Sequence, residues 1–147
     1  MASERGASDR ARPLSPHMTI WKWGPHMAVS ILHRATGTAL AIGGTILFVW
    51  WLVAAATGAD AYGTFYYYVV DAADGATGGR IANMLARLVG FGLTWAFFQH
   101  MFSGIRHLVL DTGAGYELRT NRRWAMATMI GSVVVTLIAW ATILMRH

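Results

Sequence analysis

The stretch ATGTALAIGGTILFVWWLVAAA, from Ala35 to Ala56, decides the fold because it runs for 22 residues without a charged side chain. An α-helix rises about 1.5 Å per residue, so about 20 apolar residues cross the roughly 30 Å hydrocarbon core of a membrane. Two further runs share this character: residues 88–105, extended backwards to residue 81, and residues 124–145. The sequence therefore predicts an all-α integral membrane protein whose three transmembrane helices, about residues 31–56, 82–108 and 124–145, form an up-down bundle.

Composition supports a membrane protein and excludes several other classes. Of the 147 residues, 55% are hydrophobic and 13% are charged, whereas an ordinary soluble domain has about 25% charged residues. A chain of this length cannot bury so much apolar surface in one small core. The lack of cysteine excludes disulfides, thiolate metal sites and cysteine-ligated iron–sulfur clusters. The net charge of +5 is attributed to basic cytoplasmic segments, and no nucleic-acid partner is expected.

Lysine and arginine are distributed unevenly around the predicted spans, and this predicts the orientation of the chain. Nine of them lie before or at the entry of the first span, or around the loop that joins the second and third: Arg5, Arg10, Arg12, Lys22, Arg34, Arg106, Arg119, Arg122 and Arg123. The opposite side holds three: Arg80, Arg87 and Arg146. Because Lys and Arg are enriched in cytoplasmic loops, a short N-terminal segment is predicted to lie in the cytoplasm.

The segments outside the spans are expected to be short. Residues 1–11 are polar and of mixed charge, so they are interpreted as a disordered tail and not as a cleaved signal peptide. Residues 12–147 are expected to form one membrane anchor domain. Within the first connection, YGTFYYYVV (residues 62–70) is too short to cross and is expected at the membrane interface, where aromatic rings are enriched.

A first polar cluster lies at the entry of the first span. Ser30, His33, Arg34 and Gly37 recur at i, i+3, i+4 and i+7 and therefore share one helical face. Together they offer a hydroxyl, an imidazole and a guanidinium beside a glycine, which suits an anionic or carbonyl-bearing ligand. The alternative is that Ser30 caps the helix while Arg34 extends to the lipid headgroups.

A second cluster lies at the end of the second span that is predicted to face the cytoplasm. His100, Gly104 and His107 share a face at i, i+4 and i+7, and Asp111 follows His107 at i+4. One imidazole at this position is suited to ligate a haem iron, the glycine admits a flat ring, and Asp111 is placed to orient His107. The alternative is that His100 is structural, bonded to a backbone carbonyl or to Gln99.

With these residues the chain resembles the cytochrome b subunits of succinate dehydrogenase, the larger of two membrane anchors of respiratory complex II. The resemblance covers about residues 12–145 and rests on two motifs in the right order on the right spans. The first comprises Arg12-Pro13-Leu14, Met18, Pro25, Ser30, His33, Arg34 and Thr36; the second comprises His100, Gly104-Ile105-Arg106-His107 and Asp111-Thr112-Gly113. The one departure noticed is Leu110, where relatives usually carry an aromatic residue or Met, and it removes no ligand.

The resemblance implies a role for each residue of the two clusters. His100 matches an axial ligand of haem b, whose second axial histidine comes from the smaller anchor subunit. The quinone-site positions match Ser30, Ile31 and Arg34. Residues near the haem propionates match His33, Arg34 and His107, with Asp111 supporting that polar edge.

The resemblance also implies the function and its partners. A flavoprotein subunit oxidises succinate, an iron–sulfur subunit passes the electrons on, and the two membrane anchors bind ubiquinone; this chain itself is expected to oxidise no succinate. The location implied is a bacterial inner membrane in preference to a mitochondrial one. Two alternatives stay open, an anchor of a quinol:fumarate reductase and a structural anchor without haem. A small transporter is disfavoured, because there is no inverted repeat and the polar groups cluster at one end of the spans.

Overall fold

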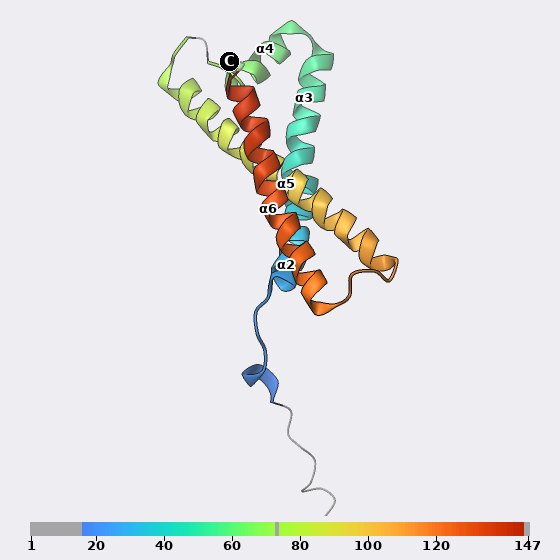
Figure 1. Ribbon diagram of the computed structural model, residues 1–147. Helices are drawn as coiled ribbons and strands as arrows, with labels where there is room; N and C mark the ends of the chain where they lie inside the picture. The colour runs from blue at the N-terminus through green and yellow to red at the C-terminus, as the bar shows by residue number, and fades with distance from the viewer. Residues whose placement is uncertain (1–15, 73, 146–147) are drawn as a thin grey trace, which may run out of the picture.

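The structure is a computed structural model that describes residues 16–72 and 74–145, and in this part of the chain it is helical without a β-strand (Figure 1). The elements are, in chain order, η1 (His17–Thr19), α2 (Pro25–Ala39), η2 (Leu40–Gly44), α3 (Thr45–Thr57), α4 (Ala59–Val69), α5 (Thr77–Asp111) and α6 (Leu118–Met145). The all-α prediction is confirmed. The tail predicted at residues 1–11, the motif residues 12–14, and His147 lie outside the described residues.

Three helices are long and apolar enough to cross a membrane, as predicted. They are Pro25–Thr57, Thr77–Asp111 and Leu118–Met145, of 33, 35 and 28 residues. At about 1.5 Å per residue each exceeds the roughly 30 Å hydrocarbon core. Each helix starts five or six residues before the predicted span, because the charge-free run marks only the part at hydrocarbon depth and the helix continues into the polar region.

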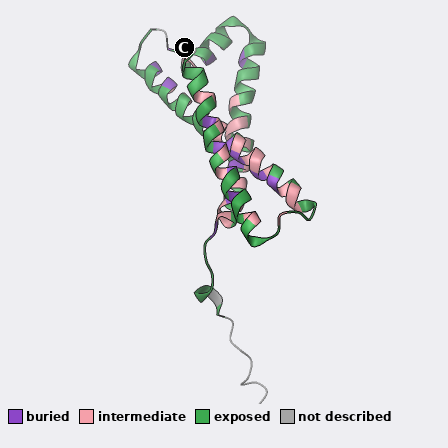
Figure 2. Ribbon diagram, in the orientation of Figure 1, coloured by how far each residue is buried: buried purple, intermediate pink, exposed green. Residues whose placement is uncertain are grey.

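The three long helices pack on one another through small and hydroxylated residues. Direct contacts join α5 to α6, α2 to α5 and α2 to α6. Figure 1 shows α5 crossing the other two at a steep angle, and Figure 2 shows buried residues gathered where they cross. The side chains buried there include Ala96, Ser103, Ala125, Thr128, Ser132 and Thr136. Such residues let membrane helices approach closely, and the large apolar side chains are left on the outside.

The first span contains an irregular turn that the sequence analysis did not predict. Residues Leu40–Gly44 form a π-helical turn that joins α2 to α3 without ending the helix. The wider i→i+5 bonding of a π-turn accommodates an extra residue within an α-helix and is frequent near functional sites. The polar cluster of the first span lies entirely on the α2 side of this turn.

The connection between the first two spans folds into an additional short helix. Most of the aromatic run predicted for the interface lies in α4, which has 11 residues and packs against α3 and α5. Phe65 is buried and meets Trp50 of α3 edge to face, with ring centroids 5.0 Å apart. Asn83 of α5 holds the connection, since its Oδ1 accepts from the Ala72 N–H at 2.7 Å and its Nδ2 donates to the Tyr67 carbonyl at 2.7 Å.

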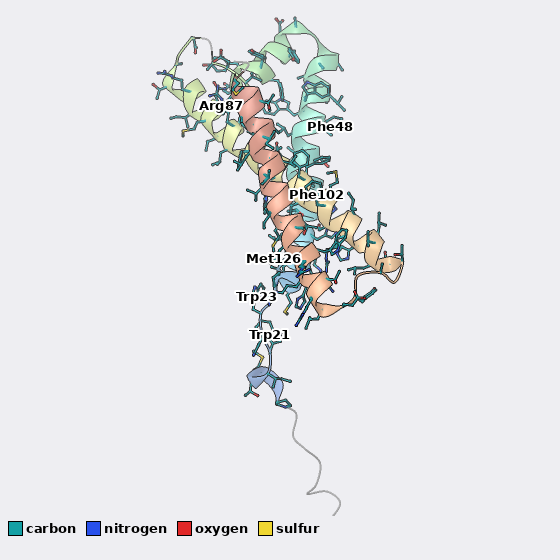
Figure 3. The ribbon with its side chains drawn as sticks, viewed as in Figure 1. Trp21, Trp23, Phe48, Arg87, Phe102 and Met126 are labelled. Carbon is teal, nitrogen blue, oxygen red and sulfur yellow. The ribbon has the colours of Figure 1, made fainter. Side chains whose placement is uncertain are left out.

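The two ends of the helical assembly differ in their side chains. Figure 3 places Trp21 and Trp23 on the segment that precedes α2, and Arg87 toward the opposite end of the molecule. Both tryptophans are exposed, and their rings meet at 5.9 Å in an edge-to-face arrangement. The imidazole cluster described next lies on the half of the molecule that carries the tryptophans.

Candidate functional site

Three imidazoles gather where α2 meets the second half of α5. The His33 and His100 rings are stacked, with centroids 4.0 Å apart and planes within 8° of each other. His107, two turns after His100, meets His33 edge-on at 5.2 Å and 60°. The histidines that the sequence assigned to two separate clusters therefore form one site.

The ring of His100 is held in a defined orientation. Its Nδ1 lies 3.1 Å from the main-chain oxygen of His33, and because a carbonyl only accepts, Nδ1 carries the proton. The Thr36 hydroxyl lies at 3.5 Å from the same nitrogen, the limit of a hydrogen bond. In the neutral ring the lone pair is thus on Nε2. Metal-ligating histidines usually bond their second ring nitrogen to a carbonyl or carboxylate in this way.

Gly37 is the residue that allows His100 to approach α2. A Cβ atom at this position would lie 2.9 Å from Cε1 and 3.3 Å from Nδ1 of His100. At Gly104, which the sequence analysis expects to admit a flat ring, a Cβ would meet only Cε1 of His33, at 3.8 Å. The face of α5 beside Gly104 is consequently the more open of the two.

Two buried polar residues of α5 lie next to the imidazoles in the sequence; the sequence analysis named Gln99 only as an alternative partner of His100 and did not name Ser103. Ser103 is fully buried, and its Oγ lies 2.7 Å from Nδ1 of His33. Gln99 is also fully buried; its Oε1 accepts from Ser132 of α6 at 2.7 Å, while its Nε2 has no partner among the described residues. Gln99 therefore ties α5 to α6 and is not a partner of His100. Polar side chains one turn from an intramembrane histidine are the signal that could have found them.

The candidate quinone residues Ser30, Ile31 and Arg34 lie on α2 on both sides of His33 in the sequence. Ser30 is half-buried, whereas Ile31 and Arg34 are exposed. Because α2 begins at Pro25 with Gly24 at its N-cap, the alternative that Ser30 caps the helix is wrong. Within the described part of the chain the Ser30 hydroxyl and the Arg34 guanidinium make no hydrogen bond to another side chain.

Asp111 is the last residue of α5 and its side chain is exposed. Among the described residues no hydrogen bond joins it to His107, so its orienting role stays a prediction. No three His, Asp or Glu side chains in residues 16–72 and 74–145 converge on a point suited to a metal ion.

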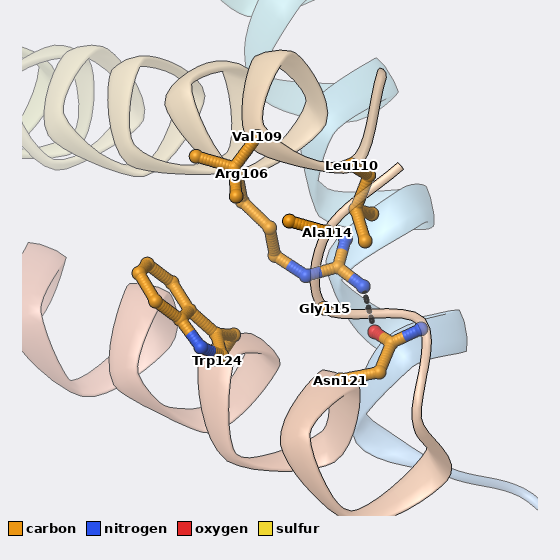
Figure 4. A pocket seen from close by; sticks show the side chains of 7 residues that line it. All are labelled: Arg106, Val109, Leu110, Ala114, Gly115, Asn121 and Trp124. Carbon is orange, nitrogen blue, oxygen red and sulfur yellow. Dashed lines mark hydrogen bonds between the residues drawn. The ribbon is translucent and has the colours of Figure 1, made fainter. Parts of the chain in front are cut away.

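Arg106, between Ile105 and His107, has a structural environment that the sequence did not reveal. It is only 6% exposed, and its Nη2 donates to Oδ1 of Asn121 on α6 (Figure 4). The guanidinium lies under the α5–α6 connection among Leu110, Ala114 and Trp124. Arg106 therefore closes the end of the α5–α6 pair and does not face the imidazoles.

Comparison with known proteins places the chain in a family. Residues 8–139 match the family described as succinate dehydrogenase/fumarate reductase transmembrane subunit. The succinate dehydrogenase cytochrome b556 subunit of Paracoccus denitrificans is 34% identical over 127 residues, which cover 86% of this chain and 88% of that protein. The cytochrome b556 subunit of Rickettsia conorii is 31% identical over 129 residues, 88% of this chain and 90% of that protein. The mitochondrial cytochrome b560 subunit of Sus scrofa is 31% identical over 123 residues, 84% of this chain and 66% of that protein.

The long apolar helices and the imidazole cluster between the first two define a helical membrane protein with a polar site inside its spans. The chain belongs to the succinate dehydrogenase/fumarate reductase transmembrane subunit family. Its family is thus one of membrane subunits of an oxidoreductase complex that takes part in electron transport. The three apolar helices and the bacterial relatives indicate an inner-membrane protein.

Proposed function

We propose that this chain is the larger membrane anchor of a succinate dehydrogenase, that His100 is an axial ligand of haem b, and that Ser30, Ile31 and Arg34 line a ubiquinone site. The observation that carries the proposal is the orientation of His100. Its Nδ1 is occupied by the His33 carbonyl, which leaves the Nε2 lone pair for a metal. Bound haem b would supply a one-electron carrier whose iron has no open coordination site when a second histidine completes it.

The remaining residues of the cluster fit the polar edge of a haem. His33, Arg34 and His107 bring two imidazoles and a guanidinium to one region of α2 and α5, and such donors bind carboxylates such as propionates. Asp111, one turn after His107, would support this edge. The second axial histidine would come from the smaller anchor subunit, as the family resemblance implies; His33, a neighbouring histidine, stacks on the His100 ring instead.

The quinone residues are suited to a carbonyl substrate at the membrane surface. The Ser30 hydroxyl is placed to donate a hydrogen bond to a quinone oxygen, and Arg34 to stabilise the negative charge that develops on that oxygen during reduction. Ile31, between them and 53% exposed, offers an apolar contact for the ring or the first part of the tail. Succinate oxidation belongs to a flavoprotein subunit, and electrons reach this site through an iron–sulfur subunit.

The proposed assembly fixes the orientation of the chain. The N-terminal segment and the α5–α6 connection, which carry most of the basic residues, lie in the cytoplasm of a bacterium, on the side where the soluble subunits bind. Lipid surrounds the large apolar side chains that the helices leave exposed.

A reduced-minus-oxidised absorption spectrum of membranes that contain the complex tests the haem assignment. We expect His100→Ala to abolish the b-type haem signal, since it removes the imidazole that we propose as the axial ligand. His26→Ala is the matched control, because His26 is an exposed histidine in the first turn of α2. An unchanged signal in His100→Ala would show that this chain provides no axial ligand, and a colourless wild-type complex would favour the anchor without haem.

Two activities measured on the same preparation test the quinone site. We expect Ser30→Ala and Arg34→Gln to lower succinate:ubiquinone reductase activity while succinate oxidation with a soluble dye persists. Thr38→Val is the control, because the exposed Thr38 hydroxyl bonds only to the backbone of its own helix, at Arg34 O (3.0 Å). Equal loss of both activities in the Ser30 and Arg34 variants would contradict a quinone role.

A quinol:fumarate reductase anchor is the second candidate, because the matched family includes both enzymes. The direction of the reaction depends on the potential of the quinone and on the soluble subunits. Purified complex assayed with ubiquinone and menaquinone analogues would decide, and faster fumarate reduction with a menaquinol analogue than succinate oxidation with ubiquinone would favour this alternative.

A further inference from the structure

We infer that Ser103 is a positioning residue: its buried hydroxyl holds His33, and through His33 it fixes the plane of the His100 imidazole. Ser103 lies three residues after His100 on α5 and is fully buried between the helices. Its Oγ and Nδ1 of His33 are 2.7 Å apart, a short hydrogen bond that joins α5 to α2.

Proton counting gives the direction of this hydrogen bond. The Ser103 Oγ also lies 2.6 Å from the Gln99 carbonyl and 3.1 Å from the His100 carbonyl, and both of these oxygens can only accept. A hydroxyl has one proton to donate. Ser103 therefore donates to the carbonyl of Gln99 and accepts from Nδ1–H of His33. The residue at position 103 must therefore supply a hydrogen-bond acceptor. A side chain with the volume of serine but no acceptor would leave the Nδ1–H of His33 without its partner.

His33 transmits this constraint to His100 through the stacking of the two rings, while its main chain holds His100 independently. Its main-chain oxygen accepts from Nδ1 of His100 at 3.1 Å, and its ring covers one face of the His100 ring at 4.0 Å with an interplanar angle of 8°. Because the two rings are nearly parallel, a rotation of the His33 ring would force the His100 ring to rotate or to separate from it. Gly37 of α2 also limits the movement of the His100 ring, because Cε1 of His100 lies close against it.

The inference rests on the proposed function, since the ring plane matters only if Nε2 binds the haem iron. The plane of an axial imidazole determines how the ligand orbitals meet those of a low-spin ferric iron. The g values in electron paramagnetic resonance therefore report the angle between the two axial imidazole planes, whereas haem content reports only whether the ligand is present. Hydrogen bonds made by the residues around an axial ligand are one of the means by which a protein tunes the properties of a haem.

Electron paramagnetic resonance of the oxidised, purified complex tests the inference. Ser103→Ala removes the acceptor, and Ser103→Cys keeps nearly the same volume but offers only a weak acceptor. We expect both variants to retain haem and to show a low-spin signal that is broadened or has a shifted largest g value. We expect Ser103→Thr, which keeps a hydroxyl, to give the wild-type signal. Thr136→Val is the matched control, because Thr136 is 1% exposed and its hydroxyl bonds only to the Ser132 carbonyl of its own helix, at 2.7 Å.

The outcomes separate the inference from the proposed function. A wild-type signal in Ser103→Ala or in Ser103→Cys would overturn the positioning role and leave the haem assignment intact. An equal shift in Ser103→Ala and Ser103→Thr would also overturn it, since the signal would then follow packing volume and not the hydroxyl. A wild-type complex without any low-spin haem signal would instead overturn the proposed function.

Discussion

Replacing Gly37 by alanine should weaken the binding of haem to the complex without unfolding it. The added Cβ would lie 2.9 Å from Cε1 of His100, whereas carbon atoms in contact are normally about 3.5–4.0 Å apart. One of the two groups must therefore move by about 0.6 Å or more. The hydrogen bond from His100 Nδ1 to the His33 carbonyl is 3.1 Å long, so a displacement of that size along the bond takes it beyond hydrogen-bonding range.

The energetic consequences for folding and for haem binding differ in size. Inserting a methyl group into a packed contact costs about 1–3 kcal/mol, and Gly→Ala within a helix recovers about 1 kcal/mol. The free energy of unfolding should thus fall by no more than about 2 kcal/mol. Loss of the bond that orients a metal-ligating histidine typically costs about 10–100-fold in affinity. We therefore expect Gly37→Ala to assemble but to bind haem about 10–100-fold more weakly.

The assay is the haem content per chain of the detergent-solubilised complex, followed by the extent of haem loss to an excess of apomyoglobin. Gly92→Ala is the control, because Gly92 lies on α5, the helix of His100, and a Cβ there would meet nothing within 4 Å. Wild-type haem retention in Gly37→Ala would refute the reasoning. Equal haem loss in Gly92→Ala would refute it as well, because the effect would not depend on the contact with His100.

Three further predictions concern polar groups outside the imidazole cluster. Asn121→Ala should destabilise the α5–α6 connection by about 1–3 kcal/mol, because it leaves the buried Arg106 without its acceptor, whereas Asn121→Asp should be tolerated; limited proteolysis of this connection in membranes would show the difference. Asn83→Ala should make the α4–α5 connection more sensitive to protease, since two backbone groups lose their partners, and Asn83→Asp, which keeps one acceptor, should have a smaller effect. Desolvation and the hydrogen bond that Tyr67 donates to Asp74 raise the pKa of Tyr67. The contribution of this hydrogen bond to folding stability is therefore fully present below the ordinary tyrosine pKa and is lost as the pH rises through the elevated value. Asp74→Asn should lower the pKa of Tyr67, measured by tyrosinate absorbance with Tyr67→Phe as the reference.

The sequence predicted the number and approximate position of the long helices because hydrocarbon thickness sets the length of an uncharged run. It did not predict where the helices end. Thr77 and Leu118 begin their helices in polar surroundings, and there neither charge nor hydropathy distinguishes helix from loop. The π-turn at Leu40–Gly44 was not predicted either, because five small or aliphatic residues satisfy α- and π-helical bonding equally well.

For the site, helical spacing placed the right residues on common faces but could not say which face meets which. His33 and His100 are 67 positions apart, and only the packing of α2 on α5 shows that their rings stack. The cap proposed as an alternative for Ser30 failed because Pro25, a favourable first helical residue, starts the helix more than a turn earlier. Ser103 was not identified because a serine in a membrane helix is commonly bonded to its own backbone, and its second partner lies on another helix.

The π-turn at Leu40–Gly44 also gives the first span a built-in means of adjustment. Because the turn holds one residue more than a regular α-helix would, deleting one residue there would restore α-helical geometry without rotating Thr45–Thr57 relative to the half that carries His33 and Gly37. The same deletion in a regular part of the span would rotate everything beyond it by about 100°. A change of one residue in chain length is therefore tolerated at this turn while the surface of Thr45–Thr57 that faces the lipid keeps its orientation.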